Sequence, residues 1–208
     1  MAVSLQVYDR KEKERGIIMF TLNVAALSND VHIPKFGTSL STCFDLEFFP
    51  TQPVVEGYNK FNEKVVRHVE EDDSITIYPG DRLLLGTALV MKLEHLPTIE
   101  DFKDIIFHDK VNLQSYSIRL HARSGLSLKQ GLVLANSEGI VDVDYQYEIF
   151  VLMTNISEVS QKIKRYTRIA QAEVMCNVPV QFLKVDEVPK PHSERSGGFG
   201  STGTHHLV

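Results

Sequence analysis

The sequence predicts an all-β protein, arranged as an antiparallel sandwich, barrel or jelly roll. Short runs rich in β-branched and apolar residues recur along the chain, and turn-forming pairs that contain glycine separate them. Helical periodicity is confined to one short segment. With 208 residues, of which 43% are hydrophobic, the chain can bury a substantial core, and we expect one principal domain.

The first half of the chain is expected to contain strands, one exposed insertion and one short helix. Residues 17–26 are rich in β-branched and apolar side chains, which favours a buried strand. Residues 74–91 alternate around a Pro-Gly pair, which predicts two paired strands that meet at a tight bend. Residues 50–73 mix turn formers with charge, so we expect an exposed insertion with at most one short strand. Residues 97–109 carry apolar side chains at helical spacing, which predicts a short helix.

The second half is expected to contain further strands and a mobile end. In residues 147–155 both alternating faces are apolar, so this strand should be covered on both sides, and a subunit interface could supply the second cover. Residues 189–208 are rich in Pro, Gly and Ser, which predicts a mobile arm after a domain of residues 1–188. The other runs that favour strands are LQSYSIRLHA, GLVLAN, GIVDVDYQYEIF and RIAQAEVMCNVPVQFLKV.

The charge balance and the cysteines exclude several classes of function. A net charge of -5 and a pI near 5.9 give no electrostatic footprint for nucleic acid or an anionic membrane, so we expect neither as a partner. Cys43 and Cys176 lie far apart and outside any CxxC pair, which excludes a disulfide framework and a thiolate zinc site. No secretory signal or apolar span is evident, and we expect a soluble, cytoplasmic protein.

Residues 139–149 (GIVDVDYQYEI) carry the first candidate chemistry. Two strands joined through residues 136–139 would form a hairpin with Asp142 near its mouth, where the carboxylate can accept a proton from water. The alternative is that Asp142 and Asp144 are solvated carboxylates at a strand edge.

The segment HARSGLSLKQG carries the second candidate. Arg123 offers a planar fork of donors for phosphate oxygens, Ser124 adds a hydroxyl, and Gly125 lets backbone amides approach an anion closely. The alternative is a polar turn with a solvated arginine.

The segment ERSGGFGSTG carries the third candidate. Its glycines permit a backbone nest for phosphate, Arg195 supplies positive charge, and Phe199 can stack on a base. It is not a P-loop, because the lysine is missing. The alternative is a flexible linker.

Five segments in order resemble the motifs of the trimeric dUTP pyrophosphatases (dUTPases). They are STCFDLEFF (41–49), ARSGLSLKQG (122–131), NSEGIVDVDYQYEI (136–149), YTRIAQAEV (166–174) and ERSGGFGSTG (194–203). The resemblance covers the chain from about residue 20 to residue 203, and it implies a distorted β jelly roll. It also implies a homotrimer in which three subunits jointly build each active site.

The resemblance implies a reaction and a role for each matching residue. The reaction is hydrolysis of dUTP to dUMP and pyrophosphate with Mg²⁺ as cofactor. Asp142 is implied to be the general base for water, Tyr145 to exclude a 2'-hydroxyl, and Asp45 to hold water around Mg²⁺. The residues implied to bind uracil are Asn136, Gly139, Ile140 and Val141. The residues implied to bind phosphates are Arg123, Ser124, Gly125 and Gln171, and those of the closing arm are Arg195, Phe199, Gly200 and Ser201.

The chain also departs from the family pattern. Cys43 and Tyr147 stand at positions where the family usually has glycine, and Thr167 stands at that of an aspartate. Residues 50–73 and 97–113 add length between the first and second motifs, and because phage members carry such insertions, a phage origin is a further expectation.

Two other functions stay open. A dCTP deaminase shares this fold, and Glu148 is the nearby candidate for its catalytic glutamate. A nucleotide-sensing regulatory protein on the same scaffold would use the inserted segments to bind a protein partner.

Overall fold

The structure is a computed structural model that describes residues 20–95, 116–178 and 180–187. The chain falls into two units, Met1–Val178 and Pro179–Val208. Among the described residues, every strand and the helix belong to the first unit, and residues 180–187 of the second form neither. The predicted domain boundary at residue 188 stays a prediction.

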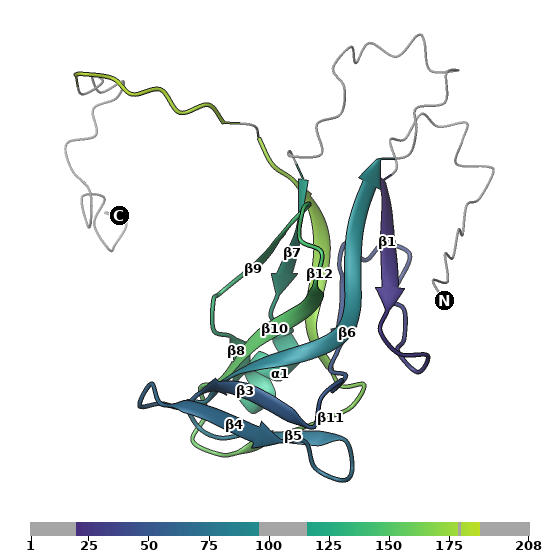
Figure 1. Cartoon of the computed structure of the whole chain (residues 1–208), viewed down its shortest axis with the longest axis vertical. Coiled ribbons are helices and arrows are strands. Elements are labelled where there is room, and N and C mark those ends of the chain that lie inside the picture. The colour runs from purple at the N-terminus through teal and green to yellow at the C-terminus, as the bar shows by residue number, and fades with distance from the viewer. Residues whose placement is uncertain (1–19, 96–115, 179, 188–208) are drawn as a thin grey trace, which may run out of the picture. The chain divides into compact units, whose positions relative to one another are not determined.

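The largest sheet is antiparallel and is built around one long strand, β6 (Figure 1). Its order is β4-β3-β6-β10-β8, and β1 pairs with the second half of β6. Within the described residues this sheet contains six strands, so β6 has neighbours along most of its length. Its strands are β1 (Phe20–Ala26), β3 (Val54–Tyr58), β4 (Lys64–His68), β6 (Arg82–His95), β8 (Leu132–Leu134) and β10 (Glu148–Asn155).

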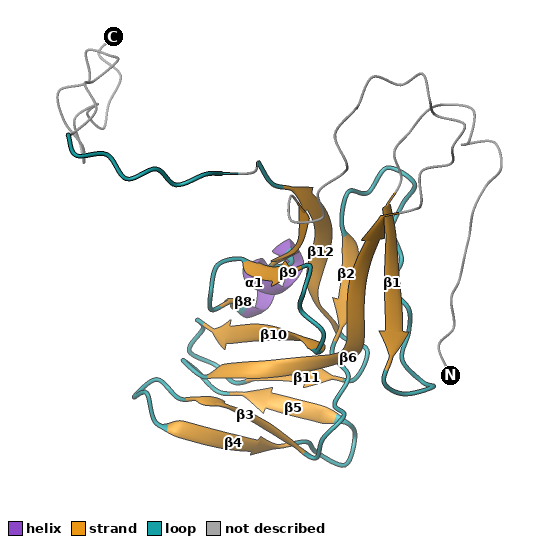
Figure 2. Cartoon of the chain, turned by 45° about the horizontal axis from the view of Figure 1, so that its top comes forward, coloured by secondary structure: helices purple, strands orange, loops and turns teal. Residues whose placement is uncertain are grey.

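Two smaller antiparallel sheets and a short helix complete the described part of the first unit (Figure 2). One sheet has the order β2-β12-β7-β9, and the other pairs β11 with β5. These elements are β2 (Phe44–Glu47), β5 (Ser74–Ile77), β7 (Tyr116–His121), α1 (Ser124–Gln130), β9 (Gly139–Asp142), β11 (Gln161–Lys164) and β12 (Arg168–Cys176).

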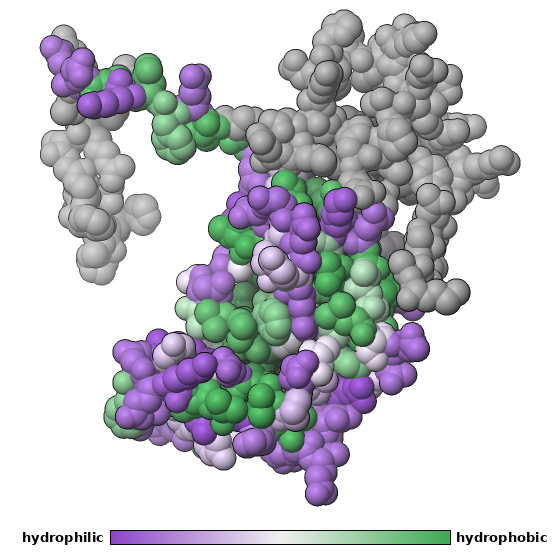
Figure 3. All heavy atoms as spheres, in the orientation of Figure 1, coloured by the Kyte–Doolittle hydropathy of each residue, from purple (hydrophilic) through white to green (hydrophobic). Residues whose placement is uncertain are grey.

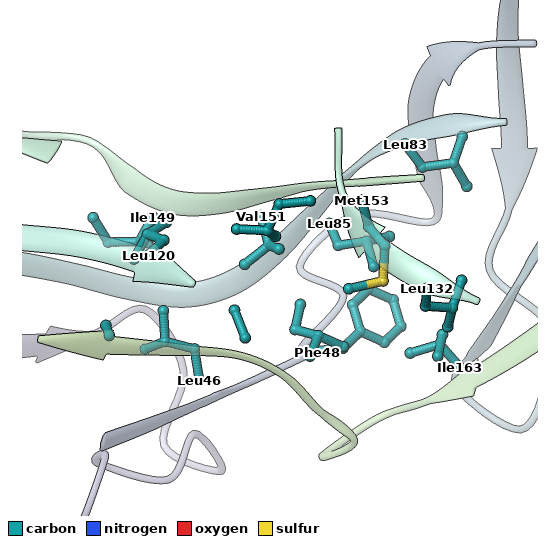
Figure 4. Packing of buried hydrophobic residues seen from close by; sticks show 14 of the residues in the cluster. Leu46, Phe48, Leu83, Leu85, Leu120, Leu132, Ile149, Val151, Met153 and Ile163 are labelled. Atoms are coloured by element: carbon teal, nitrogen blue, oxygen red, sulfur yellow. The ribbon is translucent and has the colours of Figure 1, made fainter. Parts of the chain in front are cut away.

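The three sheets enclose one hydrophobic core. Strand β10 buries alternate residues, and its Ile149, Val151 and Met153 face Leu46 and Phe48 of the opposite layer (Figure 4). This alternation is the period of two that a half-buried strand imposes. The predicted all-β class is confirmed.

The Pro-Gly turn forms as predicted, but the strands beside it do not pair with each other. The Asp81 amide donates to the Tyr78 carbonyl at 3.0 Å, and Gly80 has φ +76°, which is the conformation that a type II turn requires. Strand β5 pairs with β11, whereas β6 pairs with β1, β3 and β10. The expected strand pair was wrong, because each strand finds its partner far away in the sequence.

The predicted insertion at residues 50–73 is an ordered hairpin. Strands β3 and β4 pair over five residues each, and β3 joins the large sheet where Gly57 lies opposite Leu83. The expectation of at most one short strand was therefore wrong. Valines in both strands favour extended backbone, and pairing with β6 adds the support that the local sequence does not reveal.

The helix in the described residues, α1, was not predicted from the sequence. The helix expected at 97–109 falls outside the described residues, whereas α1 follows β7 directly. Gly131 ends α1 with φ 63°, the left-handed conformation that caps helices. Helix α1 has seven residues, and only Leu126 among them is buried. One buried apolar residue gives no repeat of apolar positions at helical spacing, so the sequence did not indicate this helix.

One apolar sheet face is left uncovered by the part of the chain that the structure describes. Phe150 is 37% exposed, Leu84 is 44% exposed and Leu152 is half-buried, and the three share neighbouring positions on β6 and β10. We call this surface the β6–β10 face. Figure 3 shows hydrophobic surface over this region. The second cover predicted for β10 is therefore absent within the described residues, and cover by a partner subunit stays a prediction.

Candidate functional site

A cavity of about 260 Å³ brings together five of the predicted site residues. Its polar rim and aromatic wall come from residues 136–145, and its floor comes from apolar side chains of β6, β7, β8 and β10. The predicted residues that line it are Asn136, Gly139, Ile140, Val141 and Tyr145.

Residues 136–139 connect two sheets rather than two strands of a hairpin. Strand β8 pairs with β10, whereas β9 pairs with β7, so β8 and β9 separate at this connection. Ser137 adopts φ 64°, and the Glu138 amide donates to the Asn136 carbonyl at 2.7 Å. The predicted hairpin was wrong, because two adjacent strands with a turn between them can also diverge. The divergence opens the cavity between β9 and β10.

Asp142 ends β9 and is exposed to solvent. Its carbonyl accepts a hydrogen bond from the Tyr145 amide at 3.1 Å, so a turn follows the carboxylate directly. The Tyr145 hydroxyl donates to the Glu148 carbonyl at 2.9 Å, and its ring meets that of Tyr147 edge to face at 5.7 Å. These contacts hold the Tyr145 ring at the cavity wall.

A second cluster forms around the Asp45 carboxylate on β2. Arg123 Nε donates to Asp45 Oδ1 at 2.7 Å, and one Arg168 guanidinium nitrogen donates to Oδ2 at 3.0 Å. Gln171 lies opposite Asp45 in the register of β12 and β2, and its side chain donates to the Ala122 carbonyl at 3.1 Å. Three predicted residues from three motifs therefore meet in one place.

Ser124 and Gly125 open this second cluster to solvent. Both are exposed at the start of α1, and a Cβ placed on Gly125 would meet nothing within 4 Å. The space beside Gly125, where other residues carry a side chain, is therefore open.

Sequence reasoning missed Arg168. The pairing of β12 with β2 has a register irregularity between Arg168 and Ala170, and the Arg168 guanidinium donates to Asp45 beside it. The position of Arg168 directly before Ile169 and Ala170 could have indicated it. Successive side chains of a strand point to opposite faces, so a charged residue beside a buried one faces outwards.

Sequence reasoning also missed a polar network that fixes the 136–139 connection. Arg119 on β7 donates to Glu138 at 3.0 Å and to Asn177 at 2.9 Å. His121, two residues further along the same face, lies 3.0 Å from Glu173. These contacts join β7 to the 136–139 connection, to β12 and to the residue after β12, so they tie the cavity lining to the sheet.

The two parts of the candidate site lie far apart within one chain. Asp142 pairs with Ser117 of β7, whereas Gln171 pairs with His121, which is about 13 Å further along that strand. Asp45 lies on β2, three strands away from β9, which adds a lateral separation of about 14 Å. One chain therefore does not bring Asp142 to the Asp45 cluster.

The remaining predicted site residues lie outside the described residues. They are Arg195, Phe199, Gly200 and Ser201, all from the predicted arm. In the described part of the chain no helix is both long and apolar enough to span a membrane.

Comparison with known proteins assigns the family. The dUTPase family model matches residues 104–203. A deoxyuridine 5'-triphosphate nucleotidohydrolase of Nautilia profundicola is 31% identical over 183 residues, which covers 88% of this chain and 98% of that protein. The protein of the same name from Brucella suis is 34% identical over 138 residues, 65% of this chain and 74% of that protein.

The solved structures that resemble this chain have the same fold. The dUTPase of Staphylococcus bacteriophage 80alpha, solved with dUPNHPP, superposes with a TM-score of 0.60 at 19% identity, over 88% of this chain and 99% of that one. The dUTPase of phage phi11, with its species-specific insert, gives a TM-score of 0.54 at 15% identity, over 81% and 97%. By its sequence relatives and its fold, this chain belongs to the dUTPase family.

Proposed function

We propose that this chain hydrolyses dUTP to dUMP and pyrophosphate, by attack of water on the α-phosphorus. The observation that carries the proposal is the cavity between β9 and β10, at 260 Å³ close to the small end of ligand pockets. It is lined by backbone edges suited to a base and lies on the strand that ends in Asp142. Family membership supports the reaction. The two free cysteines fit a reducing cytoplasm.

The cavity would select both the base and the sugar of the substrate. Backbone groups of residues 139–141, with Asn136, would pair with the edge of uracil, and cytosine would leave buried polar groups unpaired. The Tyr145 ring would pack against the deoxyribose and leave no room for a 2'-hydroxyl. We therefore propose that dCTP and UTP are poor substrates.

Asp142 would act as the general base. An exposed carboxylate at a strand end can orient a water molecule and take its proton as the new P–O bond forms. Arg123, Ser124, Gly125 and Gln171 would hold the phosphate chain, and the departing pyrophosphate would leave with its charge neutralised by these donors. Arg195, Phe199, Gly200 and Ser201 would close over the nucleotide.

The residues present fit a hydrated Mg²⁺ better than a directly bound one. In the described residues no three histidine, cysteine, aspartate or glutamate side chains gather as ligands. Asp45 accepts one guanidinium hydrogen bond on each oxygen, and its side chain is 22% exposed, so each oxygen can still accept from water. When bound, the ion would neutralise charge on the phosphate oxygens, with Asp45 holding its water shell.

We also propose that the active enzyme is a homotrimer. Asp142 and the Asp45 cluster lie too far apart in one chain to contact one triphosphate, so a complete site needs parts from different subunits. The residues of the apolar β6–β10 face also line the cavity, so a partner subunit that packs beside this face would border the uracil site. Light scattering that gives the mass of one chain under assay conditions would contradict this proposal.

The reaction is tested by product analysis with three substrates. Pyrophosphate release should be fast with dUTP and slow with dCTP and UTP. In ¹⁸O-labelled water the label should enter dUMP, because water attacks the α-phosphorus. Label found in pyrophosphate, or equal rates with UTP, would contradict the mechanism.

Replacing Arg123 with lysine is expected to weaken substrate binding and turnover. Lysine keeps the charge but lacks the planar fork that can bind Asp45 and at the same time offer donors to a phosphate oxygen. We expect kcat/KM for dUTP to fall by roughly tenfold to a hundredfold. Steady-state kinetics measure this, and Lys129→Arg, an exposed change at the other end of α1, serves as control.

A second role is favoured by the inserted hairpin. The hairpin of β3, β4 and the turn between them exposes Tyr58, Phe61 and Val66 to solvent, and an open hollow of about 660 Å³ lies beside the hairpin. We propose that this hairpin can bind a protein partner. A pull-down with the full chain and with a chain lacking 50–73 tests it, and identical captured proteins would contradict it.

Deamination gains no support, because the Glu148 carboxylate accepts a hydrogen bond from the Ala88 amide and does not line the uracil cavity.

A further inference from the structure

The position of Tyr145, the tyrosine proposed to face the sugar, depends on Glu148, which lies three residues further along the chain. The Tyr145 hydroxyl donates to the backbone carbonyl of Glu148 at 2.9 Å, across a turn of three residues. The position of the ring therefore depends on where Glu148 is held. A steric filter requires a fixed wall, since a wall that can move away leaves room for an added hydroxyl group.

Glu148 is held by its own carboxylate. Oε1 accepts a hydrogen bond from the Ala88 amide at 2.8 Å, between residues sixty positions apart in sequence. Ala88 is fully buried and has φ 54°, a conformation that L-residues rarely adopt. The same oxygen packs on Gly86, where an added Cβ would come within 2.6 Å of it. The carboxylate thus fits a space shaped by residues 86–88.

Residues 86–88 lie where the regular pairing of β6 with β10 is interrupted. Glu148 lies opposite Val90 and Phe150 lies opposite Gly86, so β6 has extra residues between the two pairs. The extra residues leave the Ala88 amide without a backbone acceptor on the neighbouring strand, and the Glu148 carboxylate accepts its hydrogen bond instead. The Thr87 hydroxyl also donates to the Ile149 carbonyl at 2.7 Å. Two bonds therefore fasten the start of β10 to this point.

The environment of the carboxylate agrees with a positioning role. Burial raises the pKa of Glu148, and hydrogen bonds from the backbone of Ala88 and Thr87 and from Thr51 lower it in part. Burying a carboxyl group is costly, and the hydrogen bonds made here offset part of that cost while they join β10 to residues 51 and 87–88. Glutamine can make the same acceptor contact without the charge.

We propose that Glu148 is a positioning residue for sugar selection, which fixes the Tyr145 ring by locking the start of β10 onto residues 86–88 of β6. The inference rests on the proposed function and concerns how the enzyme selects deoxyribose over ribose. Without the hydrogen bond from Ala88 to the Glu148 carboxylate, the backbone carbonyl of Glu148 could move, and the Tyr145 hydroxyl bound to it would move as well. The 2'-hydroxyl of a ribonucleotide would then be excluded less strictly.

The test compares kcat/KM for dUTP with kcat/KM for UTP in a set of variants. Glu148→Ala should lower the ratio of the two values by roughly tenfold, while Glu148→Gln, which keeps the acceptor, should stay within about twofold of the wild type. Glu158→Ala removes an exposed carboxylate and should leave the ratio unchanged. Tyr145→Phe should lower the ratio as Glu148→Ala does, and the double variant should lower it no further, because both act on one contact.

The outcomes separate the inference from the proposed function. A folded Glu148→Ala variant with the wild-type ratio, or one that loses both activities equally, overturns the positioning role. If that variant does not fold, Thr87→Val decides, since it removes the other bond at the same point: a lower ratio supports the role and an unchanged ratio overturns it. Wild-type protein that releases no pyrophosphate from dUTP would instead overturn the proposed function.

Discussion

Replacing Asp142 with asparagine is expected to lower kcat for dUTP by about 10²- to 10⁴-fold, the range that general-base catalysis contributes. Asparagine matches the shape of the carboxylate but cannot take the proton of the attacking water. KM should change little, because the cavity that would hold uracil is lined by other residues. Steady-state pyrophosphate release measures both constants.

Asp144→Asn is the matched control for this prediction. Asp144 is an exposed carboxylate two residues further along, and it does not line the cavity. We expect its kcat to stay within about twofold of the wild type. Equal kcat for Asp142→Asn and wild-type protein would contradict the proposed mechanism, whereas equal losses in both variants would point to a general effect of negative charge at this strand end.

The five predicted residues that line the cavity came from the family resemblance, and they lie together because they are close neighbours in the chain. All five fall within residues 136–145, so one turn and one strand bring them together without help from distant segments. The all-β class was predictable for a similar reason, since alternation along each strand reports the face that meets the core. The match of Asp45, Arg123 and Gln171 came from the family resemblance, and the structure brings these three together.

The pairing of strands was predicted poorly because it depends on distant partners. Both expected pairs, one around the Pro-Gly turn and one around residues 136–139, join strands of different sheets. A turn signal reports that the chain reverses, but not whether the two strands stay together afterwards. The bonds from Glu148 to Ala88 and from Arg168 to Asp45 span 60 and 123 positions, and no local pattern reports such contacts.

A buried ion pair between Arg67 and Asp81 joins the inserted hairpin to the scaffold, and breaking that pair should cost much of the stability of this region. Arg67 of β4 donates to both oxygens of Asp81, at 2.9 and 3.0 Å, and Asp81 is only 1% exposed. The guanidinium also lies over the Tyr78 ring at 4.6 Å. Removing one partner of a buried pair leaves the other charge without compensation, which usually costs about 3–5 kcal/mol.

Arg67→Ala is therefore expected to lower the free energy of unfolding by roughly 3 kcal/mol, near the lower end of that range because water reaches the arginine side chain, which is 26% exposed. Urea denaturation at fixed protomer concentration measures this, since association with other subunits would add to stability. Lys64→Ala breaks an exposed ion pair with Glu56 in the same hairpin and should cause no measurable change. Replacing Asp81 with asparagine in the Arg67→Ala background should recover part of the loss, because it removes the uncompensated charge while the Tyr78 amide keeps an acceptor. If Arg67→Ala were as stable as Lys64→Ala, the ion pair would not anchor the hairpin, and its contacts with β6 through Gly57 and Tyr58 would have to hold it instead.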